Sequence, residues 1–140
     1  MEVLNDVPKR EAVFRWAKDL YDRSVDRKDA AGFAAAFTPD ARLRFANNDW
    51  LVGKETIEAA IAQFFTAMID LRHEPTYTHL ANGDTLVLEA LVTYTRHDRV
   101  KVTVPACTIY HLAGADGDGR PLADECRIYV ALTPLFAPSA

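Results

Sequence analysis

The stretch "TLVLEALVTYTRHDRVKVTVPACTIYHL", residues 85–112, decides the fold class of this chain. Apolar and polar residues alternate along it with a period of two, and the short polar turn "HD" interrupts the alternation once. This pattern predicts two strands, over 85–96 and 100–112, joined as an antiparallel hairpin.

The same pattern continues on both sides of the hairpin. Further strands are predicted over 74–80 and 123–133, separated from it by the turns "ANGD" and "AGADGDGR". Apolar residues before residue 74 instead recur at spacings of three and four, which indicates helices. Helices followed by an antiparallel meander predict an α+β fold with the helices on one face of a curved sheet. A length of 140 residues fits a single domain, 1–140.

The first half of the chain predicts three helices. An apolar stripe supports the first helix from about Pro8 to Arg27, and proline suits a first helical turn. Asp29 is expected to cap a short second helix that buries Phe33 and Phe37 and ends at Pro39.

The third helix follows a short strand and a loop. "ARLRF", residues 41–45, predicts the strand, and "ANNDWLVG", residues 46–53, predicts the loop. The apolar stripe of the third helix consists of Ile57, Ala60, Ile61, Phe64, Phe65 and Met68. Clusters of this kind are most often plain core.

Composition and charge exclude several classes of function. The formal net charge is −4 and the basic residues are scattered, which argues against a nucleic-acid-binding protein. No apolar run is long enough for a signal peptide or a membrane span, so we expect a cytoplasmic protein with no membrane partner. In that compartment Cys107 and Cys126 are expected to be free thiols. We expect no metal site and no cofactor.

The two faces of the predicted sheet differ in polarity. Even-numbered residues over 86–94, 100–110 and 126–132 include no charged residue, so this face is expected to point toward the helices. The odd-numbered face mixes charged and apolar residues, which suits either a two-fold homodimer interface or an ordinary solvated face. Glu89 and Arg127 lie on it and are candidates for an interface ion pair.

Four segments carry a resemblance to a known family: "FAAAFTPDARLRF" (33–45), "VGKETIEAAIAQFF" (52–65), "VTYTRHDRVKVTVP" (92–105) and "RIYVALTPL" (127–135). On these the chain resembles the SnoaL-like family of the nuclear transport factor type (cone-fold) superfamily, related to ketosteroid isomerases and limonene epoxide hydrolases. The resemblance implies three N-terminal helices packed on a strongly curved, mostly antiparallel sheet that forms a cone with an apolar cavity.

The acid residues of these relatives are not matched. Ketosteroid isomerases use a tyrosine on the first helix, which corresponds to Tyr21, and two inward acids, whose places fall on Phe45 and Thr108. The Asp–Arg–Asp set of the epoxide hydrolases falls on Val92, Ala90 and Ile128. The resemblance therefore implies a ligand cavity without the usual carboxylates.

Three residues are the catalytic candidates. Tyr21 is expected to donate a hydrogen bond to a developing oxyanion, with His73 or Asp49 as the proton carrier. Each has an ordinary alternative, since Tyr21 could be a buried aromatic, His73 a helix cap and Asp49 a turn residue. The residues predicted to contact the ligand are Phe45, Trp50, Phe64, Met68, Val92, Tyr94, Thr108, Tyr110 and Ile128.

Other histidines carry less weight, because His97 is expected in a turn and His111 on the odd face, and the face of His79 stays open.

Two functions fit the pattern. The first is a protein that binds a small apolar molecule and catalyses acid–base isomerisation, cyclisation or hydration of a carbonyl compound. The second is a non-catalytic dimeric ligand-binding or interaction scaffold. A carboxylate at the cavity would favour the first.

Overall fold

The computed structural model describes residues 2–137, with side chains from residue 9 onward. The elements are α1 (Glu2–Arg23), the 3-10 helix η1 (Val25–Arg27), α2 (Ala30–Ala34), β1 (Phe37–Phe45), β2 (Leu51–Val52), α3 (Lys54–Phe65), β3 (Asp70–Ala81), β4 (Thr85–Thr95), β5 (Lys101–Ala115), β6 (Pro121–Val130) and α4 (Thr133–Phe136). Helices come first and the long strands follow, so the predicted α+β class is confirmed.

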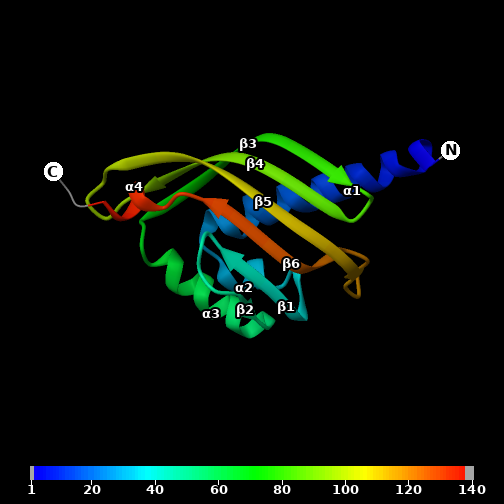
Figure 1. Ribbon diagram of the computed structural model, residues 1–140, viewed down its shortest axis with the longest axis horizontal. Coiled ribbons are helices and arrows are strands. Elements are labelled where there is room, and N and C mark those ends of the chain that lie inside the picture. Colours follow the sequence, from blue (N-terminus) through cyan, green and yellow to red (C-terminus); the bar gives the residue numbers. More distant parts are fainter. Residues whose placement is uncertain (1, 138–140) are drawn as a thin grey trace.

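One six-stranded sheet forms the centre of the molecule, with the strand order β2-β1-β6-β5-β4-β3 (Figure 1). Neighbouring strands are antiparallel except β1 and β6, which are parallel. The predicted meander of four consecutive strands, β3 to β6, is confirmed. α1 packs against β3, and α3 packs against β1 and α2. The cone-like curvature stays a prediction.

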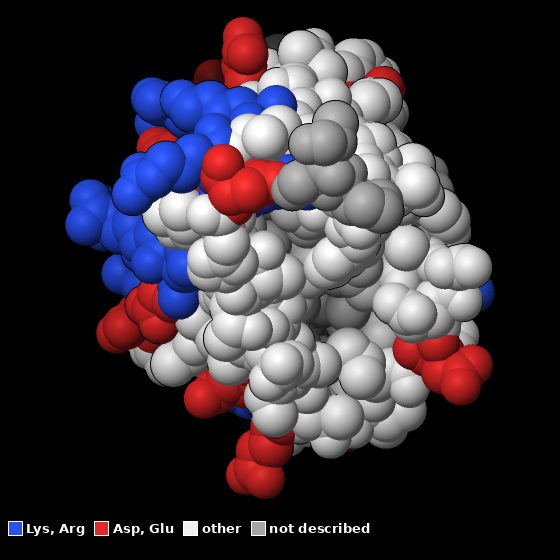
Figure 2. All heavy atoms as spheres, turned by 90° about the vertical axis from the view of Figure 1, so that its left-hand side faces the viewer, with Lys and Arg blue, Asp and Glu red and all other residues white. Residues whose placement is uncertain are grey.

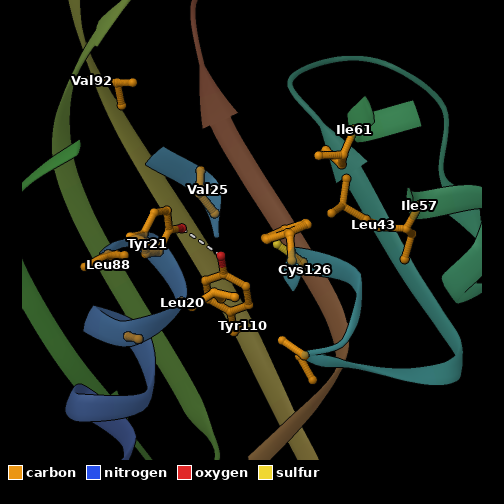
Figure 3. Close-up of a cluster of buried hydrophobic side chains, with 14 of the residues drawn as sticks. Leu20, Tyr21, Val25, Leu43, Ile57, Ile61, Leu88, Val92, Tyr110 and Cys126 are labelled. Carbon is orange, nitrogen blue, oxygen red and sulfur yellow. Dashed lines mark hydrogen bonds between the residues drawn. The ribbon is translucent and has the colours of Figure 1, made fainter. Parts of the chain in front are cut away.

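The even-numbered face of the sheet carries the core, as its polarity indicated. Along β4 every even position from Leu86 to Tyr94 is buried, while Glu89 and Leu91 between them are exposed. Side chains of α1, β1, α3 and β6 complete this cluster (Figure 3). Burial of a leucine or isoleucine side chain contributes about 1.5–3 kcal/mol, so the register of β4 is strongly determined.

The helix boundaries differ from those predicted. α1 begins before Pro8 and ends at Arg23, and the separate turn η1 takes up Val25–Arg27. Lys28 then adopts a left-handed conformation, with φ of 59°, which stops the helical path. Asp29 caps α2 as predicted, since its Oδ1 accepts a hydrogen bond from the Gly32 N–H at 3.0 Å.

The second helix is shorter than predicted, and Phe37 begins a strand instead of ending a helix. The Ala36 carbonyl accepts a hydrogen bond from the Ala123 N–H at 2.8 Å, so the chain joins β6 at this point. Sheet pairing thus overrides the helical propensity of the alanines. Phe37 is still buried, on the core side of β1.

The strand predictions need several corrections. β1 begins at Phe37 instead of 41, and β5 continues to Ala115 instead of ending at 112. β3 begins at Asp70 instead of 74, and the predicted loop over 46–53 contains the short strand β2. β6 ends at Val130, and the predicted strand tail up to 133 leads instead into α4. Pro134 explains the last change, because proline has no N–H for a sheet and suits a first helical turn.

Two expectations from composition can be compared with the structure. Within residues 2–137, no helix has both the length and the apolar character that a membrane span requires. Cys107 and Cys126 are both free thiols, as predicted.

Candidate functional site

A small apolar pocket lies between the even face of the sheet and the helices, with a volume of about 50 Å³. Phe45, Tyr94 and Val130 of the lining lie at or next to the carboxyl ends of β1, β4 and β6, which terminate at the same end of the sheet. Figure 2 looks onto this end and shows a hollow among uncharged side chains. The full lining is Tyr21, Val25, Phe33, Phe45, Ile61, Phe64, Phe65, Leu71, His73, Val92, Tyr94, Ala106, Thr108, Tyr110, Ile128 and Val130.

Two tyrosine hydroxyls meet at the base of the pocket. The Oη atoms of Tyr21 on α1 and Tyr110 on β5 are 2.7 Å apart, and both side chains are buried (Figure 3). Burial is the main reason why the pKa of Tyr21 and the pKa of Tyr110 lie well above the ordinary tyrosine range. Both hydroxyls are therefore protonated at neutral pH and can act as hydrogen-bond donors.

Tyr94 and Cys126 are neutral at this site for the same reason. Burial raises the pKa of Tyr94 to about 12. Burial also raises the pKa of the Cys126 thiol, against the opposing hydrogen bond from Tyr110. Cys126 is thus a buried thiol without thiolate character, and we assign it no chemistry.

His73 adds an imidazole ring to the pocket, and Asp26 holds it. The Nδ1 atom of His73 lies 2.6 Å from Oδ1 of Asp26, and the His73 backbone N–H donates to Oδ2 at 3.0 Å. A carboxylate only accepts hydrogen bonds, so Nδ1 carries the proton in this contact. Nε2 has no hydrogen-bond partner among the described residues. The neutral ring therefore has its lone pair on Nε2.

Local backbone structure explains why Asp26 reaches His73. Asp26 lies in η1, which exists because α1 stops at Arg23. The Lys28 ammonium donates to the carbonyls of Met68 at 2.8 Å and Ile69 at 3.3 Å, which ties η1 to the segment just before β3. His73 pairs with Val92 across β3 and β4, and both side chains line the pocket. The ring centroids of His73 and Tyr21 are 4.6 Å apart.

Sequence analysis missed Asp26, because it placed residues 8–27 on one continuous helix. The available signal was a carboxylate five residues after Tyr21, at the end of the predicted helix. This carboxylate reaches the pocket only through His73, since Asp26 does not line it.

Most of the predicted site residues come together. Tyr21 and His73 line the pocket, as do the predicted ligand contacts Phe45, Phe64, Val92, Tyr94, Thr108, Tyr110 and Ile128.

Three predicted residues do not reach the pocket. Asp49 and Trp50 lie in a separate surface groove, and the Trp50 ring contacts the guanidinium groups of Arg42 and Arg44, with ring centroid to Cζ distances of 4.2 and 4.9 Å. Met68 is fully buried in the core and does not line the pocket. Cation–π contact on the outer side of β1 turns Trp50 away from the pocket, so we drop Asp49 as a proton carrier.

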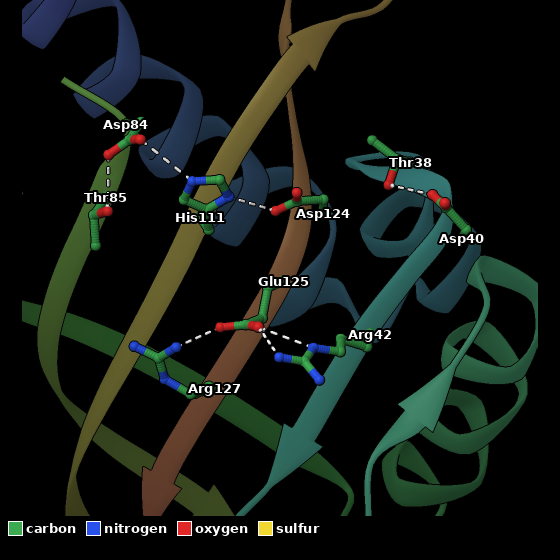
Figure 4. Close-up of polar contacts among 9 residues, drawn as sticks. All are labelled: Thr38, Asp40, Arg42, Asp84, Thr85, His111, Asp124, Glu125 and Arg127. Carbon is green, nitrogen blue, oxygen red and sulfur yellow. Dashed lines mark hydrogen bonds and ion pairs between the residues drawn. The ribbon is translucent and has the colours of Figure 1, made fainter. Parts of the chain in front are cut away.

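The remaining histidines lie outside the pocket. His79 is exposed on the outer face of β3, where its ring stacks near Tyr77. Nε2 of His97, in the turn after β4, lies 2.7 Å from the Thr66 carbonyl oxygen. His111 lies between two carboxylates, with Nδ1 2.6 Å from Asp124 Oδ1 and Nε2 3.2 Å from Asp84 Oδ2 (Figure 4).

Arg127 has a different partner from the one considered in the sequence. Glu125 binds Arg127 and also Arg42, whose Nε and Nη2 lie 2.9 and 2.6 Å from Oε1 (Figure 4). Partial burial would raise the pKa of Glu125, but the two arginines outweigh it and lower the pKa. Within the described part of the chain, Glu89 makes no ion pair.

Comparison with solved structures identifies the fold. ActVI-ORFA from Streptomyces coelicolor superposes with a TM-score of 0.72 at 23% identity, covering 86% of this chain and 95% of that one. A candidate SnoaL-like polyketide cyclase from Jannaschia sp. CCS1 superposes with a TM-score of 0.70 at 23% identity, covering 94% of this chain and 93% of that one. A protein from Catenulispora acidiphila in complex with S-DNPA superposes with a TM-score of 0.67 at 20% identity, covering 86% of this chain and 91% of that one.

An NTF2-like protein from Burkholderia pseudomallei superposes with a TM-score of 0.73 at 15% identity, covering 91% of this chain and 98% of that one, so the fold is the NTF2-like α+β fold. Residues 17–119 match the family model of the SnoaL-like domain, and the chain therefore belongs to that family. No curated protein matches the sequence. Among residues 2–137, no three His, Cys, Asp or Glu side chains are grouped so that they could hold a metal ion.

Proposed function

We propose that this protein is an acid–base enzyme that acts on a small, apolar carbonyl compound without a cofactor. The observation that carries the proposal is the His73–Asp26 pair, because His73 lines the same pocket as Tyr21 and Tyr110 and its Nε2 has no hydrogen-bond partner among the described residues. The chain itself thus supplies both a base and an oxyanion donor. The largely hydrocarbon lining suits an uncharged ligand.

The proposed reaction begins with transfer of a proton from the carbon next to the carbonyl to Nε2 of His73. The electrons of the C–H bond move to the carbonyl oxygen, and the enolate accepts a hydrogen bond from the Tyr21–Tyr110 pair. Asp26 stabilises the imidazolium that forms. Return of the proton from Nε2 to a different carbon completes an isomerisation. In a cyclisation the enolate carbon instead attacks a second carbonyl, whose C=O π electrons move to its oxygen, and the resulting alkoxide takes the proton back from Nε2.

Two observations on relatives support a small ligand and this class of chemistry. The Catenulispora acidiphila protein of the same fold binds S-DNPA. A second protein of this fold is a candidate polyketide cyclase. In our proposal His73 replaces the inward carboxylates, whose places hold Phe45 and Thr108.

The test is proton exchange at the carbon next to a carbonyl. Small open-chain enones and 1,3-diketones, which suit a pocket of about 50 Å³, would be incubated in D2O with the protein, and deuterium incorporation followed by NMR. Replacing His73 by alanine should slow catalysed exchange by about 10²- to 10⁴-fold. His97→Ala is the matched control, since His97 lies outside the pocket. Ligands that bind without any catalysed exchange would leave the non-catalytic scaffold as the better explanation.

We also propose that two copies pair through the outer face of the sheet. Tyr77, Leu91 and Tyr129 on this face are 51%, 39% and 44% exposed, which is high for large apolar side chains. Leu91→Glu should shift a dimer to monomers in light scattering, whereas Ala62→Glu, at an exposed position of α3, should not. An unchanged mass for Leu91→Glu would refute this interface.

A cytoplasmic location remains part of the proposal, supported by the two free thiols.

A further inference from the structure

A second concave site lies away from the pocket, between α1, α2 and the glycine-rich turn that joins β5 to β6. This groove has a volume of about 420 Å³ and shares no lining residue with the pocket. Its volume falls in the range of small-molecule sites, about 300–1,000 Å³. We call it the α1 groove.

Three arginines border the α1 groove. Arg15 and Arg23 come from α1, and Arg120 comes from the turn before β6. All three are exposed, and none makes an ion pair within the described part of the chain. Their guanidinium groups therefore offer hydrogen-bond donors that no carboxylate of the described side chains occupies.

The two carboxylates of the groove do not neutralise these arginines. Asp19 lies four residues from both Arg15 and Arg23, yet it pairs with neither. Asp116 closes the turn, because its Oδ1 accepts the backbone N–H groups of Asp118 at 2.8 Å and Arg120 at 3.0 Å. One of its oxygens is thus already used for local structure.

Trp16 forms an apolar wall of the groove. Its ring is partly buried and meets the ring of Tyr110 edge-on, with centroids 5.6 Å apart. The indole N–H has no partner among the described residues, and no buried polar side-chain atom lacks one, so this N–H is open to solvent. An aromatic surface beside several unoccupied donors suits an anion with an apolar part.

We propose that the α1 groove binds a small organic anion. The arginines hold its carboxylate or phosphate, and its apolar part packs on Trp16. Guanidinium groups match both anions through paired N–H donors, which makes arginine the side chain best suited to them. This site is independent of the acid–base chemistry proposed for the pocket.

The test uses Trp16 as its own reporter. The chain has two tryptophans, so Trp50→Phe leaves Trp16 as the only one. Phenyl phosphate and benzoate would be titrated, with phenol as the uncharged match and inorganic phosphate as the match without a ring. We expect a saturable change of Trp16 fluorescence with phenyl phosphate or benzoate, and weaker binding of phenol and phosphate. The stronger of the two anions identifies the preferred head group.

Variants decide whether the arginines are responsible. Arg15→Ala and Arg120→Ala should each weaken binding by about three- to tenfold, as loss of an exposed charged hydrogen bond does. Arg72→Ala, an exposed arginine of β3 outside the groove, should leave it unchanged. Binding must also persist in His73→Ala, since the pocket is a different site. Equal binding of phenol, no saturable signal, or full affinity in both arginine variants would overturn the proposal.

Discussion

Two histidines of this protein make the same contact with an aspartate but in different surroundings. Nδ1 of His73 lies 2.6 Å from Asp26, and Nδ1 of His111 lies 2.6 Å from Asp124. The other ring nitrogen of His111 also faces a carboxylate, that of Asp84, whereas Nε2 of His73 has no partner among the described residues. Nε2 of His73 can therefore take a proton from a ligand, whereas Nε2 of His111 already faces the Asp84 carboxylate, so the pair is a candidate base and the trio is a clamp.

Solvent exposure widens the difference. The side chains of His73 and Asp26 are 14% and 18% exposed, against 43% for His111 and 41% for Asp124. Water screens the outer contacts, so they contribute little to stability. The contact around His73 is better sheltered and lies beside an apolar pocket. A histidine–aspartate distance alone therefore does not identify a catalytic pair.

The largest expected effect separates these two aspartates. Asp26→Asn removes the charge that would stabilise the His73 imidazolium, and we expect catalysed proton exchange to fall about 10²-fold. Asp124→Asn changes the matching contact of His111 and should leave exchange within about twofold of wild type. The exchange rate is measured by NMR at equal folded fractions, checked by circular dichroism. If both variants lose activity equally, the two contacts are not functionally distinct.

A second comparison concerns two hydroxyl pairs, one buried in the core and one exposed on the outer face of the sheet. Tyr21→Phe leaves the buried Tyr110 hydroxyl without its partner, which should lower the free energy of unfolding by about 1–3 kcal/mol. The Oγ1 atoms of Thr93 and Thr103 form an exposed pair 2.9 Å apart. Thr93→Val should change the free energy of unfolding by less than about 0.5 kcal/mol. Urea unfolding measures both values.

The double variant Tyr21→Phe, Tyr110→Phe sharpens this second prediction. It should be destabilised by less than the sum of the two single variants, because neither tyrosine hydroxyl is then left buried without the other. Additive losses would mean that the hydroxyl contact contributes no coupling.

What the sequence could predict depends on the range of the interactions involved. Alternation over residues 85–112 correctly assigned the hairpin and its buried face. A one-residue slip in strand register would expose every even-numbered residue from Leu86 to Tyr94, so the register is well determined. Recognition of Tyr21 and His73 came from the family resemblance and the helix-to-sheet boundary. Both side chains do line the pocket, while their chemical roles stay a proposal.

The missed residues depend on contacts between distant segments. Asp26 reaches His73 because α1 stops at Arg23 and Lys28 binds the Met68 carbonyl, neither of which has a periodic signal. Asp124 reaches His111 because of a bulge: His111 pairs with Glu125 and the next residue, Leu112, pairs with Ala123. Unbroken alternation would instead send Asp124 toward the core.

The smallest expected effect is the pH dependence of the outer clamp. Hydrogen bonds to Asp124 first and to Asp84 raise the pKa of His111, against slight desolvation. A raised pKa means that the stabilisation is complete below the unfolded value of about 6.5 and is lost as the pH rises through the folded value. A hydrogen bond from Thr85 and the contact with His111 lower the pKa of Asp84, so its contribution is lost as the pH falls through that lowered value.

The clamp should therefore stabilise the fold most between about pH 4 and the raised pKa of His111. Urea unfolding of wild type and His111→Ala at pH 5.5 and pH 9 would measure the difference. We expect a small gap between the two proteins at pH 5.5 that narrows at pH 9. A gap that widens with rising pH would mean that neutral His111 is the stabilising form. The geometry argues against this, because a neutral ring has one N–H and cannot donate to both carboxylates.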